Sequence, residues 1–157
     1  MAAFTFNRFA QLSTDYVLGA SGTVIPPASW KVALATSPTS GYNKNTSVWS
    51  ATITGANVNE VGSTTAASYA RTTINRDQTG AGWTASSNDA TGSTTTGALV
   101  TFGPFTAGLA PNGANSWILT DGTPLNAGQL YFGADTAATR TFASGDTEKV
   151  TPTLKGS

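Results

Sequence analysis

Alternation of apolar and polar residues, the pattern of a strand with one buried face, recurs along most of this chain. In residues 30–36 (WKVALAT), Trp30, Val32 and Leu34 occupy every second position. This spacing predicts a half-buried strand with Trp30 in the domain core. Prolines at positions 26 and 27 precede the strand and favour an extended backbone leading into it.

The second half of the chain predicts further short strands separated by turns. Residues 116–120 (SWILT) are typical of a buried strand with Trp117 in the core. A Ser-, Thr- and Gly-rich insert is predicted at 77–97, and Asp121 and Asp135 are expected to form turns. The other strands are expected at 69–75, 98–106, 130–132, 140–142 and 148–154, with Gly133 and Gly145 among the separators.

Short strands at this spacing predict an all-β domain, either a β-sandwich or a jelly-roll-like fold. A short helix is expected at the N-terminus, over residues 4–18. We therefore expect an N-terminal arm or helix at 1–20 and a single β domain at 21–157. The three phenylalanines of the arm could either cover the domain's own core or dock on a neighbouring subunit: Phe4, Phe6 and Phe9.

A Ser-, Thr- and Asn-rich stretch at about 37–67 predicts a long loop region with weak strands at 48–53 and 58–61. Loops of this length are usually functional or stabilised by a partner. Trp49 and Trp83 lie in such polar segments, and tryptophan is enriched where interfaces gain most of their binding energy. For both residues, contact with a partner and local packing remain open alternatives.

Composition narrows the classes of partner. Charged residues make up only 10% of the chain and the formal net charge is zero, which suits a protein held within an assembly. The basic residues are scattered singly, so we expect no nucleic-acid partner. No stretch approaches the ~20 apolar residues of a spanning helix, so we expect no membrane partner.

Chemistry-bearing side chains are few. The chain has no His and no Cys, which removes Ser–His–Asp triads, cysteine nucleophiles and the usual zinc sites. Glycoside hydrolysis needs only two carboxylates, and the nearest pair in sequence is Asp146 and Glu148. We expect both to be solvated positions on an outer strand face. The sequence therefore predicts no enzyme activity, no metal site and no cofactor.

The order of the segments resembles a family of small virion structural proteins from tailed bacteriophages. The likeness rests on a phenylalanine-bearing start, WKVALAT, NEV at 59–61 and SYARTTI at 68–74. It continues through ALVTFGPFT, SWILTDGTPLNAGQLYFGA and RTFASGDTEKVTPTLKG. The resemblance implies association with the virion, either with the head or with the tail, and it carries no catalytic residues.

The leading hypothesis is a capsid decoration (cement) protein, made in the bacterial cytoplasm and located on the capsid surface. It would bind major capsid protein subunits and copies of itself as a homo-oligomer, with a trimer as one arrangement. The first alternative is a tail, neck or fibre component that contacts host glycans. The second is a small glycan-cleaving enzyme.

Overall fold

The computed structural model describes residues 3–5, 10, 29–36, 60–61, 69–78, 80–90, 92–106, 113–121 and 129–156. Strands and turns dominate these residues, and the sheets are antiparallel, so the predicted all-β class is confirmed. The strands within them are β1 (Ala3–Thr5), β2 (Ser29–Ala35), β3 (Thr72–Asn75), β4 (Ser87–Asp89), β5 (Gly92–Thr96), β6 (Val100–Phe102), β7 (Ala114–Thr120), β8 (Leu130–Arg140), β9 (Glu148–Val150) and β10 (Thr153–Gly156).

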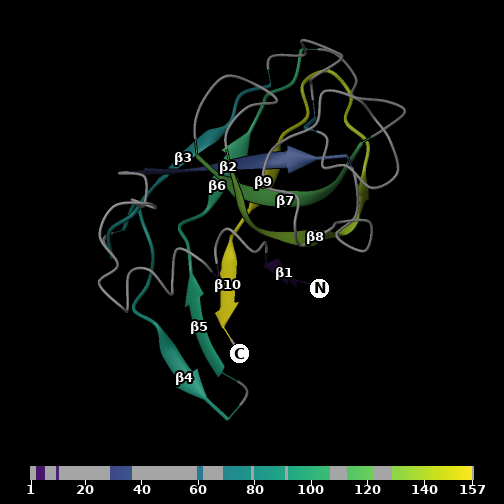
Figure 1. The fold of residues 1–157 in the computed structure, drawn as a ribbon. Coiled ribbons are helices and arrows are strands. Elements are labelled where there is room, and N and C mark those ends of the chain that lie inside the picture. The colour runs from purple at the N-terminus through teal and green to yellow at the C-terminus, as the bar shows by residue number, and fades with distance from the viewer. Residues whose placement is uncertain are drawn as a thin grey trace.

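The largest sheet has five strands in the order β1-β8-β7-β2-β3 (Figure 1). Strand β2 pairs with β7 on one side and with β3 on the other, so it lies inside the sheet. Trp30, Val32 and Leu34 are buried as predicted, but Ala33 and Ala35 are buried as well. The expectation of a half-buried strand is therefore wrong, because both faces of β2 are covered.

Strands β6 and β9 pair with each other and supply the other side of the core. Val100 and Phe102 from β6 belong to the same hydrophobic cluster as Trp30 and Trp117 from the five-stranded sheet. The Phe102 ring stacks on Tyr69 with centroids 6.0 Å apart. The core thus lies between the five-stranded sheet and the β6–β9 pair, and the core positions predicted for the two tryptophans are confirmed.

Strands β10, β5 and β4 form a separate three-stranded sheet, called here the arm (Figure 1). The arm continues the β6–β9 pair, because β5 leads into β6 along the chain and β9 leads into β10. At the junction, the Gly97 amide donates to the Pro152 carbonyl at 2.7 Å, and Gly97 also bridges to Trp83. A ribbon of strands therefore begins in the core and extends away from it.

Three sequence expectations need correction. The segment 77–97 contains β4 and β5 and is more than an insert between strands. Strand β8 runs unbroken through Gly133 and Asp135, which were expected to separate strands. Those two residues are held extended because β8 pairs with β7 on one side and β1 on the other. The predicted strand at 148–154 is instead two strands, β9 and β10.

The N-terminal expectation is tested only at its edge. Phe4 and Thr5, placed at the start of a predicted helix, lie in β1 and pair with Gly133 and Phe132 of β8. Apart from Ala10, the rest of residues 4–18 lies outside the described residues, as does the loop region 37–67 except for 60–61. The predicted division into an N-terminal segment at 1–20, which is distinct from the three-stranded arm, and a domain at 21–157 stays a prediction.

Candidate functional site

The most concentrated polar chemistry in the described residues is a buried ion pair between Glu60 and Arg71. The guanidinium binds the carboxylate through two bonds, with Nε to Oε1 and Nη2 to Oε2 both at 2.7 Å. The two side chains are 0% and 2% exposed. Two parallel charge-assisted bonds of this kind fix geometry as well as contributing energy.

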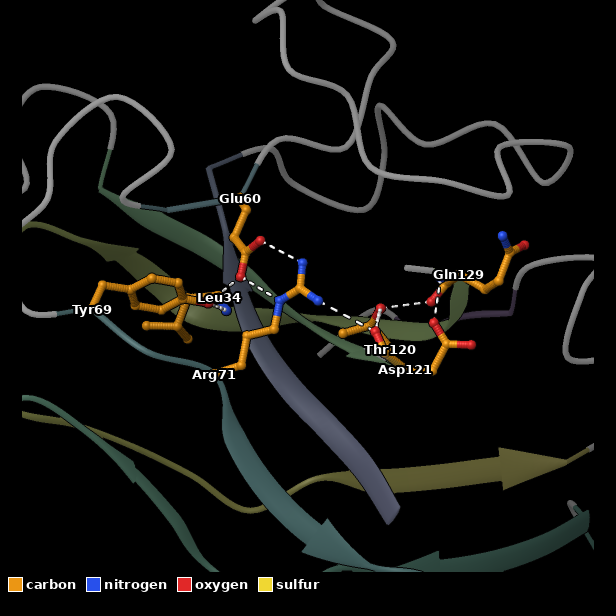
Figure 2. Close-up of polar contacts among 7 residues, drawn as sticks. All are labelled: Leu34, Glu60, Tyr69, Arg71, Thr120, Asp121 and Gln129. Atoms are coloured by element: carbon orange, nitrogen blue, oxygen red, sulfur yellow. Dashed lines mark hydrogen bonds and ion pairs between the residues drawn. The ribbon is translucent and has the colours of Figure 1, made fainter. Parts of the chain in front are cut away.

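Tyr69 extends the pair into a network (Figure 2). Its hydroxyl donates to Glu60 Oε1 at 3.0 Å and accepts from the Leu34 amide at 2.9 Å. Burial raises the pKa of Tyr69 well above its ordinary value, and the nearby Glu60 carboxylate raises it further. The phenol therefore stays protonated and serves as a donor to the carboxylate.

On its other side, Arg71 reaches the end of β7. Its Nη1 donates to the Asp121 carbonyl at 3.3 Å. The Asp121 carboxylate accepts hydrogen bonds from the backbone amide of Gln129 at 2.6 Å and from the Tyr131 hydroxyl at 2.9 Å. Asp121 thus joins the end of β7 to Gln129. The turn predicted at Asp121 continues into residues that lie outside the described ones, so it stays a prediction.

Separate segments of the sequence supply this network (Figure 2). Each contributes from one of the motifs on which the resemblance rests. Leu34 comes from WKVALAT, Glu60 from NEV, and Tyr69 and Arg71 from SYARTTI; Thr120, Asp121 and Gln129 come from the SWILTDGTPLNAGQLYFGA block. The sequence alone predicted no contact among these residues. Their order along the chain therefore has a physical meaning, since these motifs form one buried polar contact.

The network is suited to holding the fold together. A solvent-borne substrate cannot reach an ion pair whose side chains are almost fully buried. A buried pair contributes little net stability compared with apolar residues, but loss of one partner leaves an uncompensated charge. The arrangement therefore fixes how the Glu60 segment is placed against β2 and β3.

Asp146 and Glu148, the carboxylate pair considered for glycoside hydrolysis, differ in burial. Asp146 is exposed, as expected, and its Oδ2 accepts from the Ala143 amide at 2.8 Å. Glu148 is only 8% exposed, so its predicted solvated position is wrong. Burial raises the pKa of Glu148, and Arg140, whose Nε lies 3.7 Å from Glu148 Oε2, opposes that shift. The two carboxylates lie in unlike surroundings.

Of the five residues predicted as a partner interface, the structure describes Phe4 and Trp83. Trp83 is 7% exposed and packs in the core, as its local-packing alternative expects. Phe4 lies in β1 opposite Gly133. Phe6, Phe9 and Trp49 lie outside the described residues. Contact of these side chains with a partner stays a prediction.

The arm differs from the rest of the described structure, called here the body, which comprises the five-stranded sheet and the β6–β9 pair. Ser87 and Asn88 of β4 are exposed, and so are Thr153 and Lys155 of β10. All five residues of β5 (GSTTT) are half-buried, with no position fully buried on either face. The sequence reasoning missed this surface. The run of β-branched threonines, which favour strands, was a signal that could have identified β5.

In the part of the chain that the structure describes, no group of three or more acidic or other ligating side chains could hold a metal ion. Within the same part, no helix is both long enough and apolar enough to cross a membrane.

Comparisons of the chain with protein-family models, with curated proteins and with solved structures return no significant match.

Proposed function

We propose that this chain is a virion structural protein of a tailed bacteriophage that acts as a capsid decoration protein. In this role it binds the outer surface of the shell, bridges neighbouring major capsid protein subunits and stabilises the head. The proposal starts from the resemblance in segment order and from the neutral, weakly charged composition.

The observation that carries the proposal furthest is the arm. A sheet with hydroxyl side chains on β5 and with exposed residues along β4 and β10 extends from a well-packed body. Such a surface has little apolar area to hide and many hydrogen-bonding groups to offer. A cement protein needs such a contact element because it must bind the shell through its surface while its own core stays intact.

The body supports the same role by being stiff. The two bonds between Glu60 and Arg71 and the tyrosine contact to β2 add to the backbone bond from the Val61 amide to the Leu34 carbonyl. A clamp that resists outward pressure on a shell must transmit force between its contact points. A body with a densely packed core meets that need, because packed interiors have low compressibility.

The test is the location of the protein on purified virions by immunogold electron microscopy. Dense label over the head, together with loss of heat resistance in heads that lack the protein, is the expected result. Label at the tail or neck would replace the decoration role with that of a tail component. Virions that carry no label would overturn the proposal.

A second experiment addresses the enzyme alternative. Purified protein carrying Asp146→Asn and Glu148→Gln should bind empty expanded heads as well as the unaltered protein does. The matched measurement is release of sugar from host-surface glycans. Glycan cleavage that disappears in the double variant would contradict the decoration role and establish a glycosidase.

A further inference from the structure

We propose that copies of this chain associate head to tail through the arm, with the β4 edge of one copy pairing with the β10 edge of the next. The inference rests on the proposed function, because it assigns the surface through which a decoration protein would bind its own copies. It starts from the edges of the three-stranded sheet.

Both outer strands of the arm pair on one side only within the described residues. Strand β5 lies in the middle and pairs with both neighbours, so that Thr94 lies opposite Ser87 of β4 and opposite Lys155 of β10. An edge strand presents a row of backbone donors and acceptors that can pair with another chain. Addition of a strand to such an edge is a common mode of protein association.

The arm is also poorly equipped to be stable without a neighbour. Three-stranded sheets need an apolar face or a covering element for independent stability. Leu154 is the large apolar residue of the arm strands, and it is half-buried against the core cluster. Ser87 and Asn88 at the opposite edge are exposed and have no such anchor. Pairing with another strand would supply backbone bonds on the outer side of β4, where no described strand pairs with it.

Charge selects a second copy as the occupant. Strand β4 contains one acidic residue, Asp89, and strand β10 contains one basic residue, Lys155. Lys155 and Ser87 both lie opposite Thr94, and Asp89 follows Ser87 by two residues, so acid and base lie at nearby levels on opposite edges. Joining unlike edges brings opposite charges together, whereas joining two β10 edges would bring two lysines together.

The strand directions allow this arrangement to repeat. Strands β4 and β10 are both antiparallel to β5, so they run parallel to each other. When a copy in the same orientation adds its β10 edge to the β4 edge of the first copy, its own β4 edge stays available for the next copy. Such head-to-tail contacts form rings when the rotation closes. The inference therefore predicts a head-to-tail homo-oligomer in which each subunit offers its β4 edge to one neighbour and its β10 edge to the other.

The experiment uses charge reversal on the full chain and sedimentation velocity over a range of concentrations. Asp89→Lys and Lys155→Asp should each weaken self-association by about three- to tenfold, the range expected when one attractive surface pair between copies becomes repulsive. The double variant Asp89→Lys, Lys155→Asp should restore association. Lys149→Asp is the matched control, because Lys149 is exposed on β9, away from both edges.

Mixing the two single variants gives a sharper readout. Asp89→Lys protein keeps an intact β10 edge, and Lys155→Asp protein keeps an intact β4 edge. An equimolar mixture should therefore associate more strongly than either variant alone, because every β4–β10 contact between unlike variants then joins one acidic and one basic residue. Circular dichroism of each variant verifies that the fold is retained.

Three results would overturn the inference: a monomeric unaltered protein, single variants that associate normally, or a double variant that is not rescued. These measurements need no virus particle. Failure here combined with normal binding of the protein to empty heads would remove the arm interface and leave the decoration role in place. The reverse combination would remove the decoration role and leave the arm interface.

Discussion

The body and the arm of this protein treat their polar groups in opposite ways. In the body, the Glu60–Arg71 pair is almost fully buried and each partner makes two bonds to the other. In the arm, Asn88 and Lys155 are exposed. The first region satisfies its polar groups internally and gains a single defined arrangement, whereas the second leaves them available to a neighbour.

This contrast follows from where each sheet obtains its apolar cover. Strands β2 and β7 are covered on both faces, so a charge buried near them must find an internal partner. Strand β5 has no fully buried position and needs none for its hydroxyl side chains. Substitutions should therefore affect stability in the body and association in the arm.

The largest effect on stability is expected from breaking the buried pair. Glu60→Ala leaves the Arg71 guanidinium buried without its carboxylate, so the free energy of unfolding should fall by about 3–5 kcal/mol. Arg140→Ala is the matched control, because its contact to Glu148 is at 3.7 Å and its side chain is 56% exposed; it should cost about 0–1 kcal/mol. Urea unfolding followed by tryptophan fluorescence measures both.

A charge-free replacement sharpens that result. The double variant Glu60→Leu, Arg71→Met removes both charges and should recover much of the lost stability, because a buried ion pair often gives no net gain over apolar residues. Equal losses in the double variant and in Glu60→Ala would show that packing of these side chains, and not the unpaired charge, sets the cost.

The next effect concerns the tyrosine that joins the pair to β2. Tyr69→Phe removes the acceptor of the Leu34 amide and a donor to Glu60, and should cost about 1–3 kcal/mol because buried groups lose their partners. Tyr131→Phe is the control, since its hydroxyl bonds to the partly buried Asp121 carboxylate. Thermal unfolding of the two variants should rank Tyr69→Phe as the less stable.

At the junction of body and arm, Gly97 should resist substitution. A Cβ atom there would lie 2.6 Å from Ile74 Cδ1 and 3.2 Å from the Trp83 ring, so Gly97→Ala should cost about 1–3 kcal/mol through overpacking. Gly80→Ala is the control, because nothing lies within 4 Å of its Cβ position. Similar stability of the two variants by chemical denaturation would show that the junction is loosely packed.

The smallest effect concerns pH. Burial raises the pKa of Glu148 above its ordinary value of 4.5, against the pull of Arg140, so the native state holds this proton more tightly than the unfolded state. Its contribution to stability is therefore fully present below about pH 4.5 and declines as pH rises through the raised native value. Glu148→Gln should flatten this part of the pH profile, measured by urea unfolding at several pH values. An unchanged slope would contradict the assignment.

Strand character and core tryptophans could be predicted from sequence, because alternation and apolar runs report burial directly. Trp30, Trp117 and the strand at 116–120 follow from that signal. The continuity of β8 could not be predicted, because Gly133 and Asp135 are locally poor strand residues. Gly133 is held extended by β1 and β7, and Asp135 is held extended by β7.

The buried network was also beyond local reasoning. Glu60 and Arg71 are 11 residues apart and come together only after the chain has folded around β2. Nothing in the spacing of NEV and SYARTTI gives their separation in space. The contact between these two motifs could be recognised only from the structure.

Hydrogen–deuterium exchange at low and high protein concentration tests the contrast between body and arm most directly. At low concentration, backbone amides of β4 and β10 should exchange far faster than those of β2 and β7. At high concentration, β4 and β10 should become protected while the body stays unchanged, because a second copy then covers both arm edges. Equal exchange of the arm at both concentrations, or protection that grows in the body instead, would contradict the account.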